Sequence, residues 1–459
     1  MSKLVIIGLD CATPQLVFDA WLDRLPNIRS LVQRGIAGPL KSTLPPITVP
    51  AWTAMMTSKD PGMLGFYGFR NRKSYDYEDL FFANAKYVKD KTVWNYLSRN
   101  RLKSLVFGVP QTYPPKPLNG VLVASFLTPS KDVQFTYPDE IKKDLDEAAD
   151  GDYIIDVKDF RTDNKDKLVA AIYEMTRRRF KAFRKFYTSD SYDFAMMVEM
   201  GVDRIHHGFW RYFDKSHRLY EPGNPYENVI EDYYKYLDEE IGKTLEILEP
   251  DTSVMLVSDH GAKTMTGAIC INEWLQQKGW LTLKEKPTKP SRMELDMIDW
   301  SKTKAWGEGG YYSRLFLNVQ GREPQGQIPQ AEYEQFRDEV KAALEGIVDE
   351  QGNNIGTKAF KPEEVYRQAT GIPPDLIVYL GNLDWRSAGS VGVGSIYMYE
   401  NDTGPDDANH AEYGIFVFAP GAGRTVAPKD DYSIYDIAPT ILKYFDVTVP
   451  EDMIGTSIL

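Results

Sequence analysis

The sequence has few cysteines and no long hydrophobic run. Cys11 and Cys270 are the only cysteines among 459 residues, which excludes a disulfide framework and fits a reducing compartment. No segment approaches the roughly 18 consecutive apolar residues that a membrane span needs. The first apolar run, residues 4–8, is too short for a secretory signal and is preceded by a single lysine. We therefore expect a soluble, cytoplasmic protein without a membrane partner.

Positive charge is also scarce. The formal net charge is −12, and no long basic run occurs, so a nucleic-acid polymer is not expected as the principal partner. An acidic protein can still bind anionic substrates where metal ions supply local positive charge. The chain is 42% apolar and 13% aromatic, which indicates a folded protein with two or three structural units. No pattern indicates its oligomeric state.

Short apolar runs alternate with helical patterns along the chain. The runs expected to be buried parallel strands are residues 4–9, 104–108, 121–125, 194–198, 254–258, 376–380 and 415–419. The expected helices are residues 15–34, 91–100, 139–149, 165–188, 226–248, 330–345 and 434–445. This alternation predicts an α/β fold with a mostly parallel central sheet and helices on both faces. Such folds bind ligands at the carboxyl ends of their strands.

One long segment differs from this pattern. Residues 262–370 are rich in Lys, Glu, Pro and Gly, and they separate two strand candidates by more than one crossover needs. We expect an excursion or small cap there, with residues 1–261 and 371–459 forming the α/β core. Residues 61–90 are expected to form a second loop, which would cover the ligand-binding edge of the sheet.

Carboxylates and imidazoles follow three of the expected strands. Asp10 follows the first strand, either as a ligand at the binding edge or as a helix cap. Asp259 and His260 directly follow residues 254–258, and Gly261 would let the chain curve so that both reach a metal; the alternative is a solvated turn. His410 precedes residues 415–419.

The expected strand at residues 194–198 is followed by a segment with two histidines. If this segment is helical, Asp203 and His207 stand at i and i+4 on one face, about 6 Å apart, close enough to bind one ion. His206, at i+3, is the alternative ligand. His217 lies on a polar loop and is assigned no function.

Thr48 lies between Pro46 and Pro50, near the start of a short helix expected at residues 51–56. A helix N-terminus presents free N–H groups to a phosphate. A hydroxyl is a weak nucleophile there unless a metal lowers its pKa. The alternative is that Thr48 caps the helix.

Together these motifs resemble the alkaline phosphatase superfamily, and most of all its type I phosphodiesterase/nucleotide pyrophosphatase-like branch, which includes predicted phosphohydrolases and phosphomutases. The likeness spans nearly the whole chain. It is carried by the strand ending at Asp10, the Thr48 segment, Asp259-His260-Gly261, His410, and two stretches read as Leu-Pro-Asn-Ile at 25–28 and Asp-Ile-Ala-Pro-Thr at 436–440.

The resemblance implies two divalent metal ions, with Zn²⁺ or Mn²⁺ matching the ligand types. Its pattern implies one site formed by Asp10, Thr48, Asp259 and His260, and another formed by Asp203, His207 and His410. It also implies that Thr48 attacks the substrate to form a phospho-threonine intermediate.

The same resemblance implies a small phosphorylated substrate, nucleotides included, cleaved as a phosphodiester or phospho-anhydride. In nucleotide pyrophosphatases an Asn after the nucleophile holds a phosphate oxygen, and Arg70 or Asn71 is the candidate here. A phosphomonoesterase or phosphomutase using the same site is the alternative. A metal-binding protein without catalysis is a third hypothesis.

Overall fold

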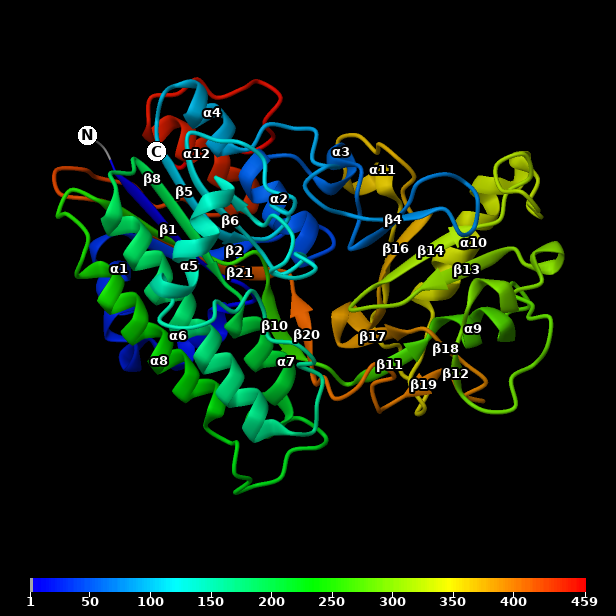
Figure 1. The fold of residues 1–459 in the computed structure, drawn as a ribbon. Helices are drawn as coiled ribbons and strands as arrows, with labels where there is room; N and C mark the ends of the chain where they lie inside the picture. The colour runs from blue at the N-terminus through cyan, green and yellow to red at the C-terminus, as the bar shows by residue number, and fades with distance from the viewer. Residues whose placement is uncertain (1–2) are drawn as a thin grey trace.

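The computed structural model describes residues 3–459, and a nine-stranded sheet lies at its centre (Figure 1). The strand order is β22-β2-β21-β9-β1-β8-β5-β6-β7. The parallel strands in the middle are β9 (Ser253–Val257), β1 (Leu4–Leu9), β8 (Phe194–Glu199), β5 (Ser104–Val109) and β6 (Gly120–Ala124). The first four are buried along their whole length, as strands covered on both faces must be. The predicted α/β fold is confirmed.

The edges of this sheet depart from the prediction. β21 (Tyr413–Ala419) was expected to be parallel, but it runs antiparallel to both β9 and β2 (Ile36–Lys41). The expectation was wrong because an apolar run does not reveal strand direction, which depends on the connection. β2 was missed because Gly38 and Pro39 interrupt its apolar pattern. Two short edge strands complete the sheet, β7 (Thr136–Tyr137) and β22 (Tyr432–Ser433).

Helices cover the sheet in two groups (Figure 1). The first group contains α1 (Pro26–Arg34), α5 (Lys142–Ala148), α6 (Lys165–Ser189), α7 (Gly201–Phe213) and α8 (Val229–Leu245). The second contains α2 (Thr48–Thr57), α4 (Val93–Arg99) and α12 (Ile437–Tyr444), and α12 contacts both of the others. The single helix expected at 15–34 is divided into a π-helix (Gln15–Ala20), a 3-10 turn (Leu22–Arg24) and α1. Pro26 causes the last break, because it disfavours a helical conformation at Leu25.

A second lobe lies beside this sheet, and we call residues 267–398 the insert unit. Its four-stranded sheet has the order β13-β14-β16-β15, with bounds Ala305–Glu308, Ser313–Leu317, Leu376–Tyr379 and Lys358–Phe360. β11 (Gly267–Cys270) pairs with β17 (Trp385–Ala388) and β19 (Tyr397–Met398). Helices α9 (Ile271–Gln277) and α10 (Tyr333–Glu345) complete the lobe, around a hydrophobic core of its own.

The position of β16 corrects another expectation. Residues 376–380 were predicted to be a parallel strand of the central sheet, but β16 runs antiparallel between β14 and β15. Strand pairing keeps the chain in the insert unit through Met398, beyond the boundary expected at residue 370. The division of the chain into core and cap segments stays a prediction.

The hairpin of β3 (Arg70–Arg72) and β4 (Leu80–Phe82) joins the two lobes. Tyr77, between its strands, stacks on Trp300 of the insert unit at 3.7 Å, and Arg72 forms a buried ion pair with Glu323. No helix within residues 3–459 combines the length and apolar character required to cross a membrane.

Candidate active site

The carboxyl ends of three adjacent parallel strands bring the predicted ligands together. β1 lies between β8 and β9, with Leu9 opposite Glu199 and Gly8 opposite Val257. The segments that leave these strands therefore start at one edge of the sheet. They carry Asp10 after β1, Asp203 on α7 after β8, and Asp259 with His260 after β9.

Asp10, Asp259 and His260 form one group of candidate ligands. The Nε2 atom of His260 lies 3.3 Å from Oδ2 of Asp259 and 3.8 Å from Oδ1 of Asp10. Both carboxylate oxygens are buried and have no hydrogen-bond partner. The other oxygen of Asp10 accepts a hydrogen bond of 2.7 Å from Nε1 of Trp52. Two unpartnered buried oxygens facing an imidazole nitrogen fit a bound cation.

The electrostatics of this group also favour a cation. Burial raises the pKa of Asp10 well above its usual value, and the nearby carboxylate of Asp203 raises it further. Burial also raises the pKa of Asp259 well above its usual value, and the nearby carboxylate of Asp10 raises it further. Burial lowers the pKa of His260 to about 4, so this imidazole is neutral at neutral pH and has a lone pair to offer. A divalent ion would relieve the repulsion between the carboxylates.

Asp203 and His410 belong to a second group of candidate ligands that also contains His260, and His207, the third ligand predicted for this site, lies beside them. The Nε2 atom of His207 lies 3.2 Å from Oδ1 of Asp203 and 3.2 Å from Nε2 of His410. Helix α7 confirms the i, i+4 arrangement of the first two. It directs His206 elsewhere, with Nε2 of His206 lying 3.2 Å from the hydroxyl of Tyr234. The geometry therefore selects His207 over His206 as the candidate ligand.

His410 reaches the site on a two-stranded antiparallel ribbon whose strands are far apart in the chain. β20 (Ala408–Ala411) pairs with β10 (Gly261–Thr264), which follows His260 directly. The rings of His260 and His410 stack with centroids 3.8 Å apart. The Nδ1 atom of His410 lies 2.8 Å from the carbonyl oxygen of Pro46, so Nε2 remains for the site. Gly261 is required at this bend, because a Cβ atom there would lie 2.2 Å from the carbonyl oxygen of Tyr413.

Three residues that were not assigned a role from the sequence support His207 on its Nδ1 side. Oδ1 of Asp406 lies 2.7 Å from Nδ1 of His207, and Oδ2 accepts hydrogen bonds from Nε of Arg161 and the hydroxyl of Tyr311 at 2.9 and 2.8 Å. The ring of Tyr311 stacks on His410 at 4.2 Å. Burial opposes protonation of His207, but Asp406 and Asp203 raise its pKa to about 9. Only Asp406 had a sequence signal, its place four residues before His410.

Thr48 is the first residue of α2, and Ile47 occupies the N-cap position. Within residues 3–459, the Thr48 hydroxyl contacts His260 and accepts no hydrogen bond from a backbone N–H of the helix, which argues against the cap interpretation. Its hydroxyl lies 3.2 Å from Nε2 of His260. The side chain is 5% exposed, at the surface of the cavity described next.

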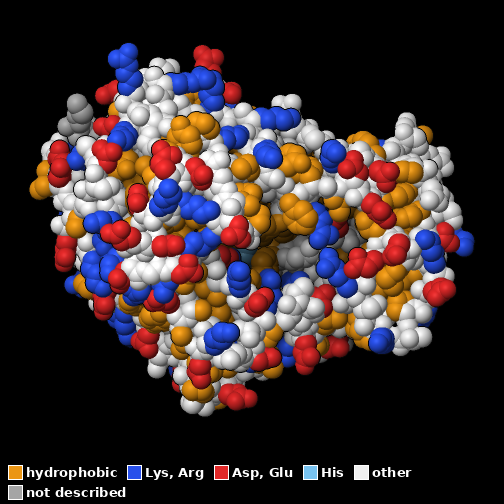
Figure 2. Space-filling view, in the orientation of Figure 1, with side chains coloured by type: hydrophobic (Ala, Val, Ile, Leu, Met, Phe, Trp, Pro, Cys, Tyr) orange, Lys and Arg blue, Asp and Glu red, His pale blue; other side chains and the backbone are white. Residues whose placement is uncertain are grey.

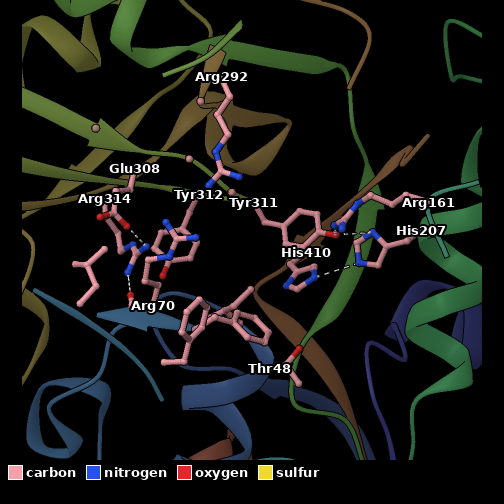
Figure 3. A pocket seen from close by; sticks show the side chains of 18 of the residues that line it. Thr48, Arg70, Arg161, His207, Arg292, Glu308, Tyr311, Tyr312, Arg314 and His410 are labelled. Atoms are coloured by element: carbon pink, nitrogen blue, oxygen red, sulfur yellow. Dashed lines mark hydrogen bonds and ion pairs between the residues drawn. The ribbon is translucent and has the colours of Figure 1, made fainter. Parts of the chain in front are cut away.

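A cavity of about 990 Å³ separates the central sheet from the insert unit. Figure 2 shows the hollow between the two lobes. Thr48, Asp203, His207 and His410 line it on the side of the central sheet. In Figure 3, Tyr311 lies above His410, and Arg292 reaches in from the opposite side. A cavity of this size holds a ligand much larger than one phosphoryl group.

The two candidate substrate contacts have different positions. Arg70 lines the cavity. Asn71 does not: its Oδ1 accepts a hydrogen bond from the backbone N–H of Tyr67, and its Nδ2 donates to the carbonyl oxygen of Gly68. Both ends of the Asn71 amide hold the loop, so the structure does not bring this side chain to the site. His217 lies apart from the cavity as well.

Buried carboxylates and imidazoles around a hydroxyl, at the carboxyl edge of such a sheet, characterise phosphoester hydrolases with the alkaline phosphatase-like fold. The chain belongs to the type I phosphodiesterase / nucleotide pyrophosphatase family, whose model matches residues 4–406. The protein is thus a phosphoester hydrolase. No curated protein sequence matches the chain.

Solved structures show the same fold at low sequence identity. An inactive variant of murine ectonucleotide pyrophosphatase / phosphodiesterase 5, in complex with AMP, is 13% identical with a TM-score of 0.56, covering 98% of this chain and 97% of that one. Phosphonoacetate hydrolase from Sinorhizobium meliloti 1021, in complex with phosphonoacetate, is 13% identical with a TM-score of 0.61, covering 97% of this chain and 95% of that one.

Proposed function

We propose that the protein hydrolyses small phosphodiesters or phospho-anhydrides, nucleotides among them, with Thr48 as the nucleophile at a site for two divalent metal ions. The supporting observation is the place of the Thr48 hydroxyl. It lies at the cavity surface, 3.2 Å from His260, beside both groups of candidate ligands. Within residues 3–459, it accepts no hydrogen bond from a backbone N–H of its helix.

The residues present fit two metal ions. Asp10, Asp259, His260 and Thr48 would hold one ion, and the unpartnered buried oxygens of Asp10 and Asp259 support this assignment. Asp203, His207 and His410 would hold the other. Carboxylate and imidazole ligands suit Zn²⁺ or Mn²⁺. When bound, the ions lower the pKa of the hydroxyl and neutralise charge on the phosphoryl group.

The protein's own residues supply the nucleophile and its orientation. The deprotonated Thr48 oxygen bonds to phosphorus, and the bond to the leaving oxygen breaks on the opposite side. This gives a phospho-threonine. Water then attacks the phosphorus, which breaks the bond to Thr48 and restores its hydroxyl. The first N–H groups of α2 face the substrate's anionic oxygens, as helix N-termini do in phosphate sites. The large cavity supports a substrate with groups on both sides of the phosphorus.

The test is a substrate screen with metal analysis. Metal-depleted protein is reloaded with Zn²⁺ or Mn²⁺ and assayed on bis-p-nitrophenyl phosphate, p-nitrophenyl phosphate and a nucleotide panel. We expect diester or anhydride cleavage that requires the metal. A preference for monoesters would replace this proposal with a phosphomonoesterase. Transfer between two hydroxyls of one substrate would indicate a phosphomutase.

Variants of α2 identify the nucleophile. Thr48→Ala is expected to keep both metals and to lose at least about a thousandfold in kcat, because the attacking group is gone. Thr53→Ala is the matched control, since Thr53 lies in the same helix and only bonds the carbonyl oxygen of Val49. Mass spectrometry of acid-quenched enzyme should find phosphate on Thr48. Full turnover by Thr48→Ala would exclude this mechanism, and a metal-loaded wild type that cleaves no ester would indicate a non-catalytic metal-binding protein.

A further inference from the structure

We propose that the cavity contains a second anion-binding subsite formed by Arg70 and Arg292. The favoured substrate then carries an additional anionic group, a carboxylate or a phosphate, besides the phosphoryl group that reacts at Thr48. This inference rests on the proposed function only in placing the reacting group at Thr48. The subsite itself follows from the charges that line the cavity.

Most of the arginines in the cavity wall already have carboxylate partners. Five arginines line the cavity: Arg70, Arg161, Arg204, Arg292 and Arg314. Arg161 pairs with Asp406, Arg204 with Asp156 and Asp203, and Arg314 with Glu308. The charges of these three are thus compensated within the protein, and each is fixed in place by its partner.

Arg70 has no such partner. Within residues 3–459, its guanidinium forms no ion pair and no hydrogen bond; it lies over the ring of Phe82, 5.5 Å from the centroid. Such stacking leaves the edge N–H groups of an arginine free to bind an anion. The position of Arg70 is fixed by β3, whose carbonyl oxygen at Arg70 accepts a hydrogen bond from Arg314.

Arg292 is only weakly paired. Its Nε atom lies 3.7 Å from Glu294, and the two side chains are 68% and 66% exposed. Water screens an exposed pair at this distance, so an incoming anion can compete with Glu294. Other carboxylates that line the cavity, those of Glu78, Asp159 and Asp296, are exposed and similarly screened.

The two arginines come from opposite lobes. Arg70 lies on the β3–β4 hairpin, and Arg292 lies on β12 (Ser291–Arg292) of the insert unit. Figure 3 shows both on the far side of the cavity from Thr48 and His207. A substrate held at Thr48 by its phosphoryl group would therefore extend toward them. Two guanidinium groups can bind one carboxylate or phosphate through charge-assisted hydrogen bonds.

The experiment compares matched esters that differ in one terminal group. Metal-loaded protein is assayed on p-nitrophenyl butyl phosphate, its carboxybutyl analogue and its phosphonobutyl analogue. We expect wild type to prefer the charged esters, mainly through KM. Arg70→Gln and Arg292→Gln should each lower the charged-to-neutral ratio of kcat/KM by about tenfold, the value of one charge-assisted hydrogen bond. This ratio is measured separately for the carboxybutyl and the phosphonobutyl ester, and the ester whose ratio falls more carries the better ligand for the subsite.

Arg99→Gln is the control for net charge, because Arg99 is exposed on α4, away from the cavity lining. Equal losses on charged and neutral esters would overturn the subsite, since the arginine would then act on the reacting phosphoryl group. Wild-type indifference to the terminal group would overturn it too. If no ester is cleaved, the proposed hydrolysis fails, and calorimetric titration with carboxybutylphosphonate and butylphosphonate still tests the subsite. Equal affinity for the two would then refute it.

Discussion

Replacing Asp406 by Asn should weaken the binding of one metal ion and leave the other unchanged. Asp406 contacts Nδ1 of His207 at 2.7 Å and is fully buried. This contact keeps the proton on Nδ1 and directs Nε2 toward Asp203 and His410. Carboxylates that orient a metal-binding imidazole typically contribute about 10–100-fold to metal affinity, or roughly 1.4–2.7 kcal/mol.

A second effect of the same substitution acts in the opposite direction at neutral pH. Asp406 and Asp203 raise the pKa of His207 to about 9, so a proton competes with the metal for Nε2 below that pH. Asp406→Asn removes the larger of these two influences. The pKa of His207 falls, and the competing proton is held less tightly. The loss of orientation is therefore measured cleanly only well above pH 9, where the imidazole is neutral in both proteins.

The assay is a competition with a chromophoric chelator above that pH, combined with NMR titration of His207 in metal-free protein. Asp407→Asn is the matched control, because Asp407 faces Arg211 rather than an imidazole. We expect one of two ions to bind about 10–100-fold more weakly in Asp406→Asn, and a lower pKa of His207. Unchanged binding of both ions, or equal weakening of both, would refute the assignment of Asp406 and His207 to one metal.

Tyr311→Phe should lower the affinity for the same metal ion by less than about tenfold in the chelator competition, because the hydroxyl that donates to Asp406 is lost while the ring still stacks on His410. A change at the other metal would contradict this. His206→Phe should make the metal-free protein less sensitive to acid. Burial lowers the pKa of His206 from 6.5 to about 3, so wild type loses stability as pH falls from 6.5 towards 3. Urea unfolding at neutral pH and at about pH 5 measures this loss of unfolding free energy. An equal loss in wild type and His206→Phe would refute the prediction. Trp306→Ala should lower the unfolding free energy by about 3–5 kcal/mol, because Trp306 is buried in the core of the insert unit. A loss below about 1 kcal/mol in denaturant titration would show that this core repacks.

Much of the central sheet could be predicted from local patterns. The runs at 4–9 and 194–198 became β1 and β8 within one residue, because strands buried on both faces are apolar at every position. The position of the candidate ligands after them was predictable for a related reason: a polar residue directly after such a strand lies at the carboxyl edge. Strand direction at β21 and the sheet membership of β16 were not predictable, since both depend on partners distant in the chain.

The sequence by itself determined which residues could bind metals and which helix would present Asp203 and His207 together, because helical spacing is a local property. Only the tertiary structure decided how these residues are supported. Asp406 and Tyr311 meet behind His207 although they lie 95 positions apart, and Arg161 joins them from a further segment. The structure also decided which arginines remain without carboxylate partners, because ion pairing depends on distances that no sequence pattern encodes.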